Sequence, residues 1–102
     1  MSVVVVATIT PLAEHRDEVI AAFQEIIDLV HGEDGCELYA LNEAQDRLIM
    51  IEKWASAEAL AAHSKGANLA ALNPKLAGKV AGLPDVVVLQ QVPAGDPAKG
   101  QL

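Results

Sequence analysis

Residues 3–10 read VVVVATIT, and Pro11 follows directly. β-branched side chains favour extended backbone, and proline cannot donate to a sheet ladder, so this stretch predicts a strand that stops before Pro11. Alternate residues of a strand point to opposite faces of the sheet. This strand is apolar on both faces, with Thr8 and Thr10 as its polar exceptions, so both faces of the predicted sheet need a cover.

The remainder of the chain contains periodic patterns of two kinds. Apolar residues at helical spacing predict a helix over residues 14–31, and Gly32 can end it. Apolar and β-branched stretches predict strands over residues 36–43, 47–55 and 85–92. Between the last two strands we expect short helices over residues 57–63 and 67–72, with Pro74 opening a further one to residue 80.

The predicted order is strand, helix, two strands, helices, strand. This is the order of the ferredoxin-like split βαβ arrangement, an α+β fold in which all helices cover one face of an antiparallel sheet. The open face of such a sheet is normally polar. Here the first strand and residues 85–92 are apolar on both faces, and no further element remains to cover them. We therefore expect a homodimer that pairs sheet against sheet; the alternative is a different partner on an exposed apolar face.

Length and composition set limits on domain count, partners and compartment. A chain of 102 residues with 52% hydrophobic content can form one domain, which we place at residues 1–92, followed by a C-terminal tail at residues 93–102. The net charge of −7 argues against binding nucleic acid or an anionic membrane surface. Cys36 is the only cysteine and no signal peptide is visible, so we expect a cytoplasmic protein.

The common catalytic and nucleotide-binding motifs do not occur in this sequence. It contains neither GxGxxG nor GxxxxGK, and no GxSxG. The three histidines have no metal-ligand spacing with one another or with Cys36, so no metal site is expected.

Two segments resemble successive patterns of one protein family. Residues 33–41, EDGCELYAL, resemble E-x-G-C-x-x-Y-x-L, and residues 52–63, EKWASAEALAAH, resemble E-x-W-x-S-x-E-A-L-x-x-H. Both patterns are those of the antibiotic biosynthesis monooxygenase family, and their order and spacing agree with the predicted topology over about residues 3–92.

The resemblance implies a fold and an activity. It implies a dimeric α+β barrel of ferredoxin-like protomers, and a monooxygenase that oxidises a small aromatic or hydroquinone-type substrate with O₂ and without a cofactor. Such a substrate can supply the electrons itself once it has lost a proton. The protein would then need only a base, hydrogen bonds to the resulting anion and a dry pocket.

Three polar residues of the matched segments are candidates for this chemistry. His63 is the candidate catalytic base, because imidazole titrates near neutral pH; alternatively, it has a structural role. The Tyr39 hydroxyl can bind a substrate oxygen, or Tyr39 can lie in the dimer interface. Glu52 shares strand parity with Trp54, so it can be a buried carboxyl with a raised pKa, or it can form an ion pair with Arg47 or with a residue of the other subunit.

The remaining candidates are substrate-binding residues. Trp54 and Phe23 can line an aromatic pocket, although either can instead be a core residue. Asn68 stands where many family members resemble H-x-x-S-x-H and have a second histidine. Asn68 can hydrogen-bond a substrate but cannot accept a proton, so a mechanism that needs the second histidine does not apply here.

Two other functions remain open from the sequence. Haem-degrading enzymes of the same superfamily look similar in having a tryptophan followed by a haem-ligating histidine, as Trp54 and His63 are placed. They also carry an asparagine on the first strand, which residues 3–10 lack. The second alternative is a barrel that binds a small hydrophobic molecule without turning it over.

Overall fold

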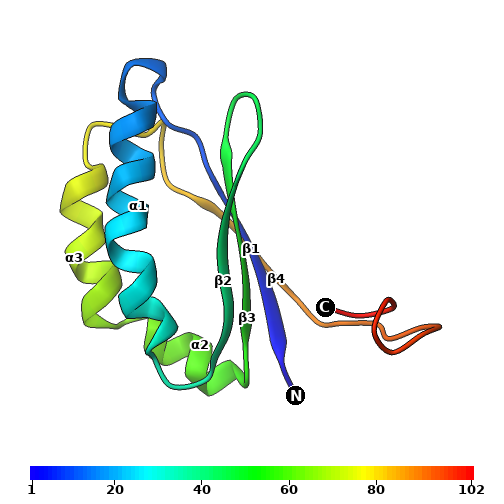
Figure 1. Cartoon of the computed structure of the whole chain (residues 1–102). Helices are drawn as coiled ribbons and strands as arrows, with labels where there is room; N and C mark the ends of the chain where they lie inside the picture. Colours follow the sequence, from blue (N-terminus) through cyan, green and yellow to red (C-terminus); the bar gives the residue numbers. More distant parts are fainter.

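Four antiparallel strands form one sheet in the order β2-β3-β1-β4 in the computed structural model, which describes residues 1–102 (Figure 1). The strands are β1 (Val3–Ile9), β2 (Cys36–Glu43), β3 (Leu48–Trp54) and β4 (Asp85–Leu89). The central strand β1 pairs with β3 on one side and with β4 on the other. This order confirms the predicted ferredoxin-like α+β fold.

The helices are α1 (Arg16–His31), α2 (Ala57–Ser64) and α3 (Ala67–Leu76), and all lie on one face of the sheet (Figure 1). A short 3₁₀ turn at Ala13–His15 precedes α1. The Ser56 side chain caps α2 by accepting a hydrogen bond from the backbone N–H of Ala59.

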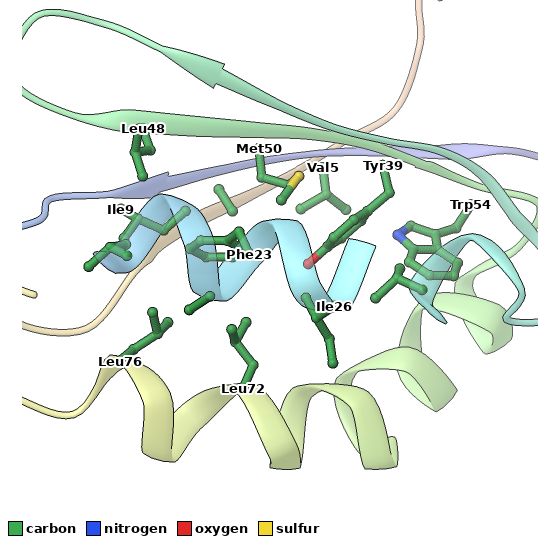
Figure 2. Close-up of a cluster of buried hydrophobic side chains, with 14 of the residues drawn as sticks. Val5, Ile9, Phe23, Ile26, Tyr39, Leu48, Met50, Trp54, Leu72 and Leu76 are labelled. Atoms are coloured by element: carbon green, nitrogen blue, oxygen red, sulfur yellow. The ribbon is translucent and has the colours of Figure 1, made fainter. Parts of the chain in front are cut away.

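The hydrophobic core fills the layer between the sheet and helices α1 and α3 (Figure 2). Alternate residues of β1 and β3 point into this layer, as their period of two requires. Helix α1 contributes the apolar stripe Val19, Ala22, Phe23, Ile26 and Val30. The inward side of β3 carries Leu48, Met50, Glu52 and Trp54, so this strand places one carboxyl in the core layer.

The structure differs from the prediction around Pro74, and the predicted helix break there is wrong. Helix α3 runs through Pro74 to Leu76, and no helix covers residues 77–80. Proline inside a helix costs about 3 kcal/mol. The buried side chains of Leu72 and Leu76 flank it, and burying a leucine contributes about 1.5–3 kcal/mol, so packing of this face offsets the lost hydrogen bond.

The last strand is shorter than residues 85–92. Its pairing with β1 ends where Leu89 lies opposite Val4, so residues beyond this point have no partner strand. The C-terminal residues lie on the side of the sheet away from the helices (Figure 1). No helix of the structure is both long enough and apolar enough to cross a membrane.

The sheet face away from the helices, called here the open face, is apolar at its centre. The strand register aligns one residue of each strand in a row, namely Ala40, Ile51, Val6 and Val87. Val87 is 46% exposed and the neighbouring Leu89 is 39% exposed. An uncovered row of aliphatic side chains is unfavourable in water, so this face is a candidate interface.

Candidate active site

A pocket of about 140 Å³ lies between the sheet and helices α1 and α3. Nine of its 13 lining residues are hydrophobic, among them Phe23 and Met50. Its polar groups come from Glu52, His63 and Asn73 and from the hydroxyl of Tyr39, whose ring is one of the nine hydrophobic lining residues. Larger hollows occur beside the C-terminal residues, but they contain no comparable group of buried titratable side chains. The pocket in the core layer is therefore the candidate active site.

Glu52 reaches this pocket because it follows Met50 on the inward side of β3. Its side chain is buried, and Oε1 accepts a hydrogen bond of 2.9 Å from the Trp54 indole N–H. Burial raises the pKa of Glu52, while the Trp54 hydrogen bond and the His63 charge partly offset the shift. The alternative of an ion pair between Glu52 and Arg47 is wrong, because Arg47 pairs with Asp46.

His63 comes from α2 and is 4% exposed. Its ring packs on Trp54 at a centroid distance of 4.4 Å and meets the Tyr39 ring edge-on at 5.4 Å. Its Nδ1 lies 2.9 Å from Glu33 Oε1, and its Nε2 lies 4.0 Å from Glu52 Oε1. The imidazole is therefore held between two carboxyl groups, with one of its nitrogens bound to Glu33.

Gly35 allows the turn that carries Glu33 to lie close to helix α2, which begins more than 20 residues later in the chain. Gly35 has φ +79°, and a Cβ built there would lie 2.5 Å from the Cβ of Ala59 in α2. Only glycine permits both this backbone conformation and this close approach. The Ala55 N–H also donates to the Gly35 carbonyl at 2.8 Å, so the turn after α1 packs directly against the start of α2.

Tyr39 points from β2 into the core layer, next to Trp54 and Met50 (Figure 2). This position contradicts the alternative in which Tyr39 lies in an interface formed by the open face. The Tyr39 hydroxyl makes no hydrogen bond within the chain. It is therefore not one of the fully buried polar side-chain atoms, all of which have a partner. Burial, together with the negative charges of Glu52 and Glu33, raises the pKa of Tyr39. The hydroxyl therefore remains protonated and can donate to a ligand.

Four of the six predicted site residues line the pocket: Phe23, Tyr39, Glu52 and His63. The other two, Trp54 and Asn68, do not line the pocket but contact residues of the site. Trp54 is fully buried against His63, and the Asn68 amide nitrogen donates to Glu33 Oε2 at 2.8 Å.

Glu33 was not among the predicted site residues, although it contacts both His63 and Asn68. Its place as the first residue of the E-x-G-C pattern was the available signal. Asn73 of α3 was also not predicted to line the pocket. No group of three or more His, Cys, Asp or Glu side chains is arranged to hold a metal ion.

The sequence model of the antibiotic biosynthesis monooxygenases matches residues 2–75. The chain belongs to this family. The matched segment contains Glu33, Tyr39, Glu52 and His63, so the polar part of the pocket lies within the family domain. No curated protein matches the chain.

Solved structures support the same fold assignment. The Rv0793 protein of Mycobacterium tuberculosis has 23% identity and a TM-score of 0.85, over 94% of this chain and 100% of its own. A candidate antibiotic biosynthesis monooxygenase from Caulobacter crescentus has 25% identity and a TM-score of 0.83, over 89% and 90%. A Bacteroides thetaiotaomicron protein, described as a candidate oxidoreductase, has 23% identity and a TM-score of 0.77, over 86% and 95%.

We expect Glu52→Gln to stabilise this monooxygenase-family chain at neutral pH and to leave its stability in acid unchanged. Because burial raises the pKa of Glu52, the folded state binds the proton more tightly than the unfolded state does. The wild type therefore loses stability as pH rises from the unfolded pKa through the folded one, and the neutral amide does not. The glutamine can still accept from Trp54, so the hydrogen bond is kept.

Urea unfolding of both proteins from about pH 4 to about pH 8 measures this difference. Glu37→Gln, on the exposed side of β2, is the matched control and should show no such increase. A stability difference for Glu52→Gln that does not change with pH would contradict the assignment of a raised pKa to Glu52.

Proposed function

We propose that this protein is a cofactor-independent monooxygenase that oxidises a small hydroquinone or phenol with O₂. The observation that carries the proposal is the convergence of His63, Tyr39 and Glu52 on one mostly apolar pocket. Family membership supports monooxygenase chemistry. The pocket provides the three requirements of that chemistry, which are a base, a hydrogen-bond donor for an oxyanion and a dry environment.

The volume of the pocket favours a substrate with a single aromatic ring. An apolar protein cavity of about 150 Å³ takes up benzene. The present pocket, at about 140 Å³, matches one ring and is too small for three fused rings. Its walls include Phe23, Met50 and Leu72, which suit the ring, while the polar side chains suit hydroxyl groups at its edge.

The reaction begins when Nε2 of His63 accepts the phenolic proton. The phenolate gives one electron to O₂, and the resulting phenoxyl radical and superoxide combine to form a carbon–oxygen bond. His63 returns its proton to this peroxide. Elimination of water then breaks the oxygen–oxygen bond, and the proton of the ring carbon leaves through His63. One oxygen atom stays in the product as a carbonyl and the other leaves as water.

Tyr39 and Glu52 have supporting roles in this scheme. The raised pKa of Tyr39 keeps its hydroxyl protonated, so it donates to the phenolate oxygen. Glu52, which burial also favours in its protonated form, offers its second oxygen to a substrate hydroxyl. Trp54 holds Glu52 through its indole N–H and supports the His63 ring.

Haem does not fit this pocket. A macrocycle of four pyrrole rings needs several times the volume of a single aromatic ring, and the pocket measures about 140 Å³. Nδ1 of His63 is bound to Glu33, and Glu52 lies 4.0 Å from Nε2, where an iron atom would have to approach. Strand β1 also has no asparagine.

Oxygen uptake by the purified, chelator-treated protein tests the function. We expect hydroquinone to support uptake of one O₂ per substrate without accumulation of hydrogen peroxide, and anthrone, with three fused rings, to support less. Accumulation of peroxide would indicate a two-electron oxidase and would contradict monooxygenation. Absence of uptake with all single-ring phenols and hydroquinones would contradict the proposal altogether.

A second copy of the chain covers the open face in this proposal. Sheets that pack face to face bury interdigitating aliphatic side chains. The row formed by Ala40, Ile51, Val6 and Val87 spans all four strands and provides such a surface. A two-fold axis pairs this patch with itself, so one surface is sufficient for a homodimer.

Ile51→Lys is expected to weaken this dimer by about 100-fold or more, because it places an unpaired charge in a desolvated apolar interface. Sedimentation velocity at micromolar concentration measures the change. The control is Leu83→Lys, since Leu83 is 94% exposed and lies in the connection between α3 and β4. A wild-type chain that sediments as a monomer would contradict the dimer, as would an Ile51→Lys variant that dimerises normally.

A further inference from the structure

We propose that Glu33 is the positioning residue of the site, which holds His63 in the Nδ1–H tautomer, and that Asn68 holds Glu33. The catalytic consequence rests on the proposed function, whereas the tautomer can be measured without any substrate. No contact between Glu33 and the pocket is required, because Glu33 acts through the imidazole.

The tautomer follows from the hydrogen-bonding capacity of the partners. Glu33 Oε1 lies 2.9 Å from Nδ1 of His63. An ionised carboxylate can only accept hydrogen bonds, so the proton of the neutral imidazole lies on Nδ1. Nε2 then carries the free lone pair, and His63 is a lining residue of the pocket. A base that accepts the phenolic proton needs this tautomer.

Glu33 also stabilises the product of that proton transfer. Once Nε2 has taken the proton, the imidazole is a cation in a site where His63 is 4% exposed and Glu33 19% exposed. The hydrogen bond between Nδ1 and Glu33 then joins two opposite charges, which strengthens it. A neutral residue at position 33 would leave the buried cation with only Glu52 nearby, at 4.0 Å.

Asn68 gives the second oxygen of Glu33 a fixed partner without adding charge. Its amide nitrogen donates to Glu33 Oε2 at 2.8 Å, so each carboxylate oxygen has one donor. A protonatable side chain at position 68 would compete with His63 for the negative charge of Glu33. The neutral asparagine thus leaves the negative charge of Glu33 to His63. Asn68 acts on Glu33 alone in this arrangement, and it does not line the pocket.

Nitrogen-15 NMR of the ring nitrogens tests the inference in the full-length chain, which has only three histidines. At a pH at which the imidazole is neutral, we expect wild-type His63 to be protonated on Nδ1. Glu33→Ala should shift His63 towards the Nε2–H form. Asp34→Ala removes the adjacent carboxylate of the same turn and should leave the His63 signals unchanged. A wild-type Nε2–H tautomer, or an unchanged tautomer in Glu33→Ala, would overturn the proposal.

Glu33→Gln covers the case in which the alanine variant does not fold, since it keeps the length and shape of the side chain. Its neutral amide is a weaker acceptor, so the Nδ1 proton resonance should move upfield; an unchanged resonance would overturn the proposal. In turnover, either variant should lower kcat by about 10- to 100-fold and leave KM nearly unchanged, because Glu33 does not touch the substrate. If the wild type shows the Nδ1–H tautomer but no turnover, only the proposed function fails.

Discussion

We expect His63→Ala to lower kcat for hydroquinone oxidation by about 10²- to 10⁴-fold, which is the usual contribution of a general base. The variant loses the Nε2 atom that we propose as the acceptor of the phenolic proton, on a residue that lines the pocket. The apolar walls formed by Phe23, Met50 and Leu72, which we propose hold the substrate ring, are unchanged, so KM should change much less than kcat.

Steady-state oxygen uptake gives both constants. The matched control is His15→Ala, because His15 pairs with Glu18 at the start of α1, away from the pocket lining, and should retain full activity. Sedimentation and circular dichroism establish that the His63 variant is folded and assembled as the wild type is. A folded His63→Ala protein with wild-type kcat would remove His63 from the mechanism.

Trp54→Ala should lower the free energy of unfolding by about 3–5 kcal/mol, the range for deleting a large buried aromatic side chain. Trp54 is fully buried, and it is the only tryptophan of the chain. Its removal also leaves Glu52 without its hydrogen-bond donor and His63 without the ring it packs on. Because domains of this size are stable by about 5–15 kcal/mol, this is a large share of the total.

Urea unfolding at one fixed protein concentration measures the loss, since the proposed dimer would make apparent stability depend on concentration. Trp54→Phe keeps most of the buried ring but lacks the N–H, so it separates packing from the hydrogen bond. We expect it to cost about 1–3 kcal/mol, the range for leaving a buried partner unsatisfied. Equal losses in the two variants would show that the ring itself contributes little.

The strands and the first helix could be predicted because each depends on a local pattern. The alternation of β3 also located Glu52 on the same side as Trp54, and this parity is what buries the carboxyl. The prediction failed at Pro74, where a local rule for helix breaking competed with the burial of Leu72 and Leu76 against the rest of the core. Only the packed structure decides which of these two effects is larger.

The sequence by itself determined the fold class, the apolar character of both sheet faces and four residues of the pocket wall. Each of these follows from periodicity or from the two matched motifs, which are properties of short segments. The tertiary structure alone showed that Glu33 binds His63 and Asn68, across separations of 30 and 35 residues. Both contacts depend on how closely the turn at Gly35 packs against α2. A local sequence pattern predicts the elements themselves but not the distance between two elements after they pack.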